Sequence, residues 1–336
     1  MALRKLTVLG ILIATLGCDN VAWGGTELSL QPPPSKRDTL ESSAGSSVDS
    51  ANPDSVAVVE GPVLFMGRRD GNTVSLVPVG EIRGRGLRAL PTEEESPGFM
   101  ERFTRKHLAP GTDFTLFAEG VRVGTMVAST TGVTDGFCAV RPTVSGRLEL
   151  VQEAADAERF LALARSNGDA RPYAPYRKLN HNRDQRVMSL NLMGGIVRRV
   201  GATLPPSFLE IRRDIQVFDL TDGSPPAIVA TFVYRDGLDV GPTPPGAYSV
   251  FLMGTDDGAG YSTAYMAYRQ YDVRGKGTPR LFDRLDWDGD GQAEILLEVA
   301  GEESMSLAAI HRRDGEWMEL FHDVCGGPLT SATSAP

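Results

Sequence analysis

The sequence predicts a mainly β fold in which antiparallel hairpins follow one another. Glycine and proline, 37 and 22 of the 336 residues, make up about 18% of the chain against an average of roughly 12%, an excess typical of many turns between short strands. From residue 56 onward, short runs rich in Val, Leu, Phe and Tyr alternate with turn signals. We therefore expect residues 56–336 to form a β-rich globular body built from hairpins and meanders, with one or two packed helices.

Pairs of apolar runs that flank a short turn predict individual hairpins. The predicted pairs begin with a strand at residues 56–66 before the turn at 69–72, and continue with 114–118 and 121–128, 215–220 and 227–234, 248–253 and 262–271, and 307–312 and 317–321. Arg-Asp-Gly occurs at Arg69, Arg235 and Arg313, but at unequal spacing. This recurrence indicates shared turn chemistry and not a sequence repeat.

Two stretches depart from the β pattern and predict helices packed on the sheets. Residues 152–165 are rich in helix formers, and their apolar side chains recur at helical spacing: Ala157, Phe160, Leu161 and Ala164. Residues 184–200 have an apolar face made of Val187, Leu190, Met193 or Gly194, Val197 and Val200. The pair Gly194-Gly195 predicts a kink or an early end of this second helix, because glycine costs about 1 kcal/mol relative to alanine inside a helix.

The first eighteen residues are typical of an export signal. Arg4 and Lys5 precede an apolar stretch at residues 6–16, which is long enough for a signal peptide and too short to span a bilayer. Gly17 and Cys18 follow, and a small residue before a cysteine at this place resembles the lipobox of bacterial lipoproteins, although Thr15 stands where that family usually has Leu. The resemblance implies that residues 1–17 are removed and that Cys18 is lipidated. An ordinary secretory peptide cut nearby is the alternative, and either signal exports the chain.

The segment after the cysteine predicts a flexible linker to a membrane anchor. Residues 31–55 are dense in Pro, Ser, Asp and Ala, and such a composition buries too little apolar surface to offset the entropy of ordering the chain. We therefore expect residues 18–55 to comprise the lipidated cysteine and a linker. Two lipid chains are sufficient for stable anchoring, so the resemblance implies a bacterial membrane as a partner, on its periplasmic or surface side.

Two further cysteines form the remaining pair if Cys18 carries lipid. Cys138 and Cys325 would then lie in an oxidising compartment, where an even pair favours a disulfide. In the chain-entropy model, such a bridge would stabilise the body by on the order of 4 kcal/mol. Two separate buried thiols are the alternative, because the sequence does not fix the geometry that a bridge requires.

One acidic motif near the C-terminus predicts a metal site. Asp286, Asp288 and Asp290 occupy alternate positions, Gly291 allows a sharp turn after them, and a strand-like run follows at residues 295–299. Calcium prefers six to eight oxygen ligands, so the backbone carbonyl of Gln292 and the carboxylate of Glu294 would complete much of the shell. The alternative is a solvated acidic turn that holds no metal.

The spacing of this motif argues against an EF-hand and favours another calcium loop. An EF-hand needs a bidentate Glu at its twelfth position, which here is the apolar Leu297. The motif instead resembles the calcium loops of FG-GAP and VCBS-type repeats, which join two strands of a β-propeller blade, except that Glu294 replaces the Asp more often found there. The resemblance covers residues 280–321 in a single copy. It implies a blade-like hairpin, a propeller-like arrangement at most, and side-chain ligation of calcium by Asp286, Asp288, Asp290 and Glu294.

The remaining sequence features give no active site. The four histidines are scattered, and no nucleophile elbow, Walker loop or dinucleotide fingerprint is present. The net charge of −9 is spread along the chain, which argues against a nucleic-acid partner. We expect a membrane-anchored, calcium-stabilised envelope lipoprotein that acts as a binding or structural module, with an envelope protein or a glycan as partner. The alternative is an envelope hydrolase acting on a polymer, in which calcium is purely structural.

Overall fold

The computed structural model describes residues 58–168, 174–220, 225–323, 325 and 327–329. Every pairing between its named strands is antiparallel. The predicted mainly β fold is therefore confirmed. The signal peptide predicted at residues 1–17 and the lipidated Cys18 and linker predicted at residues 18–55 lie outside the described residues.

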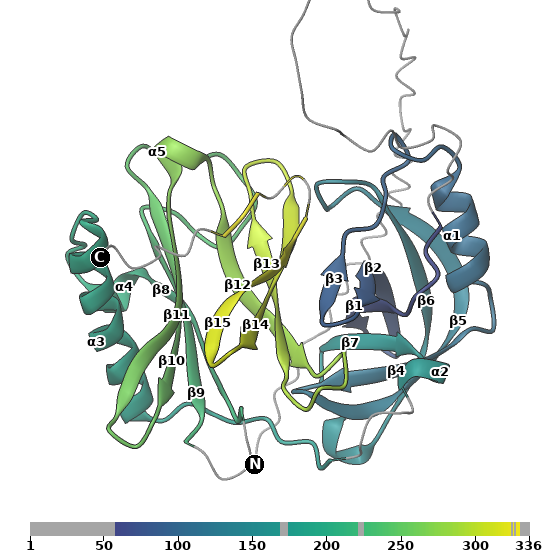
Figure 1. Ribbon diagram of the computed structural model, residues 1–336, viewed down its shortest axis with the longest axis horizontal. Helices are drawn as coiled ribbons and strands as arrows, with labels where there is room; N and C mark the ends of the chain where they lie inside the picture. The colour runs from purple at the N-terminus through teal and green to yellow at the C-terminus, as the bar shows by residue number, and fades with distance from the viewer. Residues whose placement is uncertain (1–57, 169–173, 221–224, 324, 326, 330–336) are drawn as a thin grey trace, which may run out of the picture. The chain divides into compact units, whose positions relative to one another are not determined.

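The first half of the described chain forms a six-stranded barrel. Its strands follow the order β1-β7-β4-β5-β6-β2, and the ring closes because β1 pairs with both β7 and β2 (Figure 1). Helix α1 adds Phe99 and Phe103 to the same core as Phe65 and Phe114 of the strands. The elements are β1 (Val63–Asp70), β2 (Thr73–Arg83), β3 (Gly86–Arg88), which extends the sheet beyond β2, α1 (Phe99–His107), β4 (Asp113–Ala118), β5 (Val121–Thr134), β6 (Arg141–Leu150), a 3-10 turn at Gln152–Ala154, β7 (Arg159–Ala164) and α2 (Arg165–Gly168).

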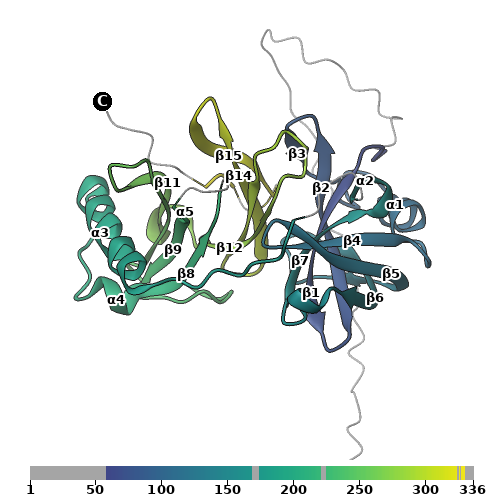
Figure 2. The same cartoon turned by 90° about the horizontal axis from the view of Figure 1, so that it is seen from below.

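The second half forms two four-stranded antiparallel sheets that pack against each other. The first sheet has the order β11-β10-β9-β8 and the second β12-β13-β14-β15 (Figures 1 and 2). Their shared core includes Val229 and Phe251 from the first sheet and Leu297 and Ile310 from the second. The elements are α3 (Arg183–Val200), α4 (Phe208–Ile211), β8 (Arg212–Phe218), β9 (Ala227–Tyr234), β10 (Tyr248–Asp256), β11 (Tyr261–Gln270), α5 (Tyr271–Arg274), β12 (Thr278–Leu285), β13 (Glu294–Ala300), β14 (Met305–Arg313) and β15 (Glu316–His322).

The β12–β15 sheet lies between the barrel and the other sheet. A buried cluster joins it to the outer face of the barrel, with Leu64 and Leu161 on the barrel side and Leu296 and Phe321 on the sheet side. We call this cluster the joint core. Each of the two sheets has the strand order of a propeller blade, but the other described strands belong to the barrel rather than to a ring of blades.

Hairpins are present at all five predicted places, but the strand predicted at residues 56–66 is displaced: β1 begins at Val63, residues 58–62 form no strand, and residues 56 and 57 lie outside the described residues. Asp70 pairs with Thr73 across the first turn, and the other four pairs of runs form β4–β5, β8–β9, β10–β11 and β14–β15. Two of the turns have positive φ at a non-glycine residue, 52° at both Glu119 and Asp314, each followed by a glycine that also has positive φ. Two successive residues of positive φ form a type I′ turn, whose twist matches that of the flanking strands.

The helix predicted at residues 152–165 is wrong, because this segment forms a 3-10 turn and then strand β7. All four central residues of β7 are buried: Phe160 and Ala162 face the barrel core, whereas Leu161 and Leu163 face the joint core. A strand that is buried on both faces has an unbroken apolar run, which sequence periodicity does not distinguish from a buried helix. Packing on two sides therefore outweighed the helix propensity of Ala and Leu.

The second predicted helix is confirmed as α3, but the early end at its glycine pair is wrong. The helix continues through Gly194 to Val200, and it begins with a capping box between Asn182 and Gln185. Its buried face packs on the β8–β11 sheet, which offsets the low helix propensity of glycine. Val187, expected on the apolar face, is instead 48% exposed.

Candidate metal centre

The acidic motif forms the loop between β12 and β13, the first two strands of the β12–β15 sheet. Leu285 pairs with Glu294 at the base of the loop, so the two strands fix both of its ends. Glu294 is the first residue of β13 and is only 3% exposed. The hairpin therefore holds one carboxylate in the protein interior while Asp286, Asp288 and Asp290 extend along the loop above it.

The four predicted carboxylate residues converge in space. Asp286, Asp288, Asp290 and Glu294 each offer an oxygen, and these oxygens all lie within 4.8 Å of one another. Two ligands that bind one calcium ion at about 2.3–2.6 Å lie at most about 5.2 Å apart. The separation therefore fits one shared cation, and it is the one such group of acidic, histidine or cysteine side chains found among the described residues.

Backbone hydrogen bonds hold the loop in this shape. The carboxylate of Asp286 accepts the N–H groups of Gly289 at 2.6 Å and Gly291 at 3.0 Å. Asp288 and Asp290 each accept the N–H of the residue two positions further along, at 2.9 Å. Gly289 and Gly291 have φ of 84° and 89°, a backbone region that favours glycine. The predicted sharp turn at Gly291 is therefore present, and a second one occurs at Gly289.

The electrostatics of the loop favour a positive ion at its centre. Burial, followed by the negative charges of Asp288 and Asp286, raises the pKa of Glu294 to about 8. Burial likewise raises the pKa of Asp288, with further contributions from Asp290 and Asp286. Each shift reflects the cost of placing several negative charges together in a partly buried space. A divalent cation at their centre would remove this cost.

Trp287 anchors the loop in the protein interior. It lies between two of the acidic residues in sequence, yet its side chain is 0% exposed and belongs to the joint core. Its backbone N–H donates to Glu294 at 3.0 Å. The shape of the acidic loop is thereby coupled to the packing of the barrel on the sheet.

Two residues that lie near the loop could not be identified from the sequence. Nε of Arg85, in the turn between β2 and β3, lies 4.0 Å from the carboxylate of Asp290. His311 in β14 is also close enough for the charges of Asp288 and Asp290 to act on it, but burial is the largest effect and lowers the pKa of its imidazole. Both residues are far from the loop in sequence, so only the packing of the elements brings them there.

The other residues considered for metal binding are also placed by the structure. The backbone N–H of Gln292 donates to Asp290, so Gln292 belongs to the loop without adding a carboxylate to the group. Leu297 lies in the core between the two sheets, as expected of a residue that does not bind metal. His107 and His322 contact the carbonyl of Val59 and the carboxylate of Glu319, respectively.

A disulfide joins Cys138 to Cys325 and links the barrel to the end of the chain that follows β15. The pair thus forms the bridge that was one of the two alternatives. Disulfides persist in oxidising compartments, so this bond indicates an extracytoplasmic location. Beside it, the backbone N–H of Cys138 donates to the carbonyl of Met305 in β14, which adds a second connection between the barrel and the sheet.

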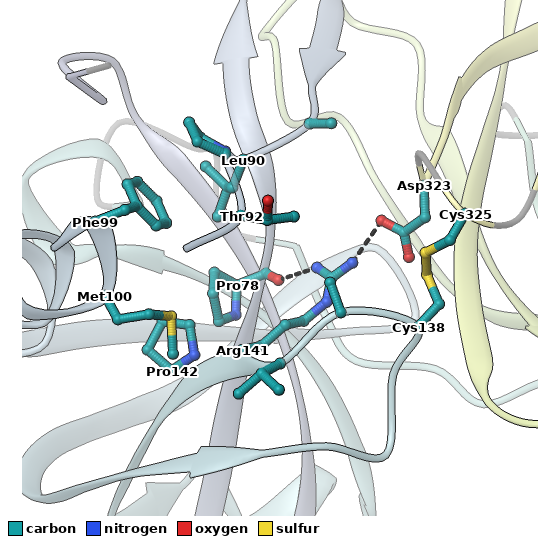
Figure 3. A pocket seen from close by; sticks show the side chains of 14 residues that line it. Pro78, Leu90, Thr92, Phe99, Met100, Cys138, Arg141, Pro142, Asp323 and Cys325 are labelled. Atoms are coloured by element: carbon teal, nitrogen blue, oxygen red, sulfur yellow. Dashed lines mark hydrogen bonds and ion pairs between the residues drawn. A yellow bond between two sulfur atoms is a disulfide. The ribbon is translucent and has the colours of Figure 1, made fainter. Parts of the chain in front are cut away.

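An apolar pocket of about 140 Å³ lies beside this disulfide (Figure 3). Phe99 and Met100 of helix α1 form part of its wall, and Arg141 extends between them and the disulfide. The guanidinium group of Arg141 donates to the carbonyl of Pro78 and forms an ion pair with Asp323. Because this cation is already neutralised by Asp323, the pocket offers mainly apolar surface to a small molecule.

A second candidate site is a polar hollow beside the joint core, and no sequence motif points to it. Glu119 from the β4–β5 turn and Asp283 from β12 both line this hollow. The backbone N–H of Glu119 donates to the Asp283 carboxylate at 3.1 Å. Burial, together with the negative charge of Glu119, raises the pKa of Asp283 to about 7. The two acids lie 164 positions apart in the chain, so no motif could have revealed the pair.

Among the described residues, none of the helices combines the length and the apolar character needed to cross a bilayer. Comparison of the chain with protein-family models, with curated protein sequences and with solved structures found no match.

Proposed function

We propose that this protein is a lipid-anchored module of the bacterial cell envelope in which one calcium ion stabilises the packing of the barrel on the β12–β15 sheet, and which acts as a binding or structural module. The proposal rests mainly on the four carboxylates of the loop, whose oxygens lie within 4.8 Å of one another. The side chain of Trp287, in the same loop, is buried in the joint core. The disulfide agrees with an exported location. The anchor itself rests on the lipobox-like sequence before Cys18.

Calcium suits this donor set better than softer metals do. The four side-chain ligands are carboxylates, and hard cations such as calcium prefer oxygen, whereas zinc sites are usually built from cysteine and histidine. The resemblance of the loop to FG-GAP and VCBS-type repeats points to the same ion. Bound calcium would neutralise the repulsion among the acids and hold Trp287 in place.

Thermal unfolding with calcium and with a chelator tests the metal assignment. At a calcium concentration 100 times the dissociation constant, binding to the folded state alone adds about 2.7 kcal/mol, which corresponds to a rise of several degrees in Tm for a domain of this size. The double variant Asp288→Ala/Asp290→Ala should lose this response.

A matched control separates metal binding from a general effect of charge. Asp256→Ala/Asp257→Ala removes the same charge from the last residue of β10 and the first residue after it, which belong to no metal-ligating group among the described residues. This control should respond to calcium as the parent protein does. Equal Tm values for the parent in calcium and in chelator would refute the metal assignment.

Mass spectrometry of the mature N-terminus tests the anchor. A diacylated Cys18 as the first residue would support the lipoprotein assignment, whereas an unmodified N-terminus at another residue would remove it. This result does not depend on the metal, so the two parts of the proposal can fail separately.

A second candidate function, an envelope hydrolase acting on a polymer, is favoured by the pair of acids in the polar hollow. Hydrolysis of a glycosidic bond uses two carboxyl groups, one of them with a raised pKa, and Asp283 has such a pKa beside Glu119. Release of new reducing ends from envelope polysaccharides, abolished by Asp283→Asn and by Glu119→Gln, would support this function. Absence of release by the parent protein would favour the binding module.

A further inference from the structure

A polar cleft lies where the barrel, both sheets and the connection before α3 meet. It consists of two adjoining hollows of about 270 and 310 Å³, whose walls share Glu119, Arg159, Lys178 and Arg280. We call the two hollows together the basic cleft. None of the acidic-loop residues lines it, so it is a site separate from the candidate metal centre.

The basic cleft is lined by four basic residues, Arg68, Arg159, Lys178 and Arg280, and by four acidic ones, Glu119, Glu158, Asp214 and Asp283, but its cations are not all paired. Arg68 and Arg280 both donate to one carboxylate, that of Glu298, at distances of 2.6 to 2.7 Å. Two guanidinium groups thus share one negative charge. Arg159 and Lys178 form no ion pair with a carboxylate of the described residues, so their charges are available to a ligand.

Among the described residues, the acids that line the basic cleft form no ion pair with Arg159 or Lys178, and the carboxylate of Asp214 instead accepts a hydrogen bond from the side-chain amide of Gln216 at 2.8 Å. Glu119 is already paired with Arg284 at 2.8 Å, and Arg284 does not line the cleft. Burial raises the pKa of Asp283 to about 7, so near neutral pH this group is only partly charged. Glu158 at the rim is exposed to solvent.

The arginines of the cleft are held in place before a ligand arrives. Phe282 of β12 lies under two of them, with the Cζ atoms of Arg68 and Arg159 at 5.5 and 5.9 Å from its ring centroid. Arg159 also donates to the carbonyl of Leu281 at 3.0 Å and to Gln216 at 3.1 Å. Guanidinium groups that are already ordered lose little entropy on binding, and their planar shape matches that of a carboxylate.

The same cleft contains groups suited to sugar hydroxyls. Tyr176 lines it beside the cations, and burial raises the pKa of its hydroxyl to about 12, so the hydroxyl remains a neutral donor. The exposed carboxylate of Glu158 can accept hydrogen bonds from hydroxyl groups. A ligand that satisfies both sets of groups would carry negative charge on a polyhydroxylated framework.

We infer that the basic cleft binds an acidic oligosaccharide, a sugar chain with carboxylate groups, through Arg159, Lys178 and Arg280. Tyr176 and Glu158 contact its ring hydroxyls. This inference deepens the binding role in the proposed function and rests on that role, because it names the site and the class of ligand.

Isothermal titration of the mature protein in calcium tests the inference, with tetragalacturonate as the acidic probe, cellotetraose as the neutral one and inorganic phosphate as a simple anion. Tetragalacturonate should bind with a submillimolar Kd that weakens as salt increases, because salt screens charge pairs. Lys178→Glu should weaken this binding at least tenfold, the equivalent of about 1.4 kcal/mol. The neighbouring exposed Arg177 lines neither hollow, so Arg177→Glu should change the Kd by no more than about threefold.

Three results would overturn the inference: no binding of tetragalacturonate, equal loss of binding in the two variants, or phosphate binding as tight as that of the sugar. Lys178 is exposed, so Lys178→Glu should unfold at the same Tm as the parent protein. The calcium response of Tm is measured on the same samples. Absence of sugar binding by the parent protein, with an intact calcium response, refutes this inference alone, whereas sugar binding by the parent protein without a calcium response refutes only the metal assignment.

Discussion

The carboxyl group of Asp283 has its charge set by its position between the barrel and the sheet. It accepts hydrogen bonds from the backbone N–H groups of Glu119 and Arg284, which favour the charged form. Burial is the larger effect and raises its pKa to about 7, whereas an aspartate in an unfolded chain titrates near 3.9. Asp283 is therefore a group whose ionisation opposes folding.

The pH dependence of stability should reveal this group. Between about pH 4 and pH 7 the folded protein holds a proton on Asp283 that the unfolded chain has released, so this carboxyl group makes the free energy of unfolding fall as the pH rises through that window. Asp283→Asn should remove the contribution and gain stability relative to the parent by up to a few kcal/mol between pH 4 and pH 8, at about 1.4 kcal/mol per pKa unit.

Denaturant unfolding at several pH values, in constant calcium, measures this difference. The substitution changes one hydrogen-bond acceptor, which adds an offset that does not vary with pH. The experiment therefore follows how the difference in free energy of unfolding between variant and parent changes with pH. If the free energy of unfolding changed with pH in the same way for the parent protein and the variant, this result would contradict the assigned pKa of Asp283.

At the scale of single elements, β7 shows how two neighbouring layers determine one strand. The strand pairs with β1 and β4 inside the barrel, and its alternate residues reach two different cores. A helix at this place could face only one core at a time. The barrel would also remain open, since β7 connects β1 to β4 in the ring.

Truncation of Leu163 tests the assignment of β7 at the element scale. Leu163 lies outside the apolar stripe of the helix that the sequence predicts, but it is fully buried in the joint core. We expect Leu163→Ala to lower the free energy of unfolding by about 2–5 kcal/mol, measured by denaturant unfolding. Val127 in β5 is 49% exposed, so Val127→Ala should cost about 0.5 kcal/mol or less. A similarly small loss for Leu163→Ala would argue against β7 as a strand buried on both faces.

At the scale of the whole described unit, the barrel and the β12–β15 sheet are connected in several independent ways. The joint core supplies apolar contact, and Nη2 of Arg68, which donates to both carboxylate oxygens of Glu298, supplies charge pairing. The disulfide adds a connection that depends on redox state, and the acidic loop adds another that a bound metal ion would strengthen. These connections favour cooperative unfolding of the barrel with the sheet.

Removal of the disulfide should destabilise this unit without abolishing its fold. The bond joins residues 187 positions apart, and loss of a native disulfide typically costs about 2–5 kcal/mol. We expect Cys138→Ser/Cys325→Ser to lower the denaturant midpoint accordingly while the calcium response of Tm persists. Treatment of the parent protein with reductant should have the same effect. An unchanged midpoint after confirmed reduction would show that the bond does not contribute to stability.

The local features of this protein follow from short stretches of its sequence. The type I′ hairpin turns, the acidic loop and the capped helix α3 follow from residues that are neighbours in the chain, because turn geometry and loop ligation act over a few positions. The spacing of Asp286, Asp288 and Asp290 needed no tertiary contact to indicate a common centre. The order of hairpins likewise fixed the mainly β class.

Other features depend on residues that are distant in the chain, and they become visible only in the folded protein. Closure of the barrel, burial of β7 on both faces and burial of Trp287 in the joint core all require surfaces that are far apart in the sequence. The basic cleft is assembled in the same way, with Arg68, Lys178 and Arg280 coming from three separate segments. The charge and burial of a side chain depend on all of its neighbours in space, whereas the sequence specifies only its neighbours along the chain.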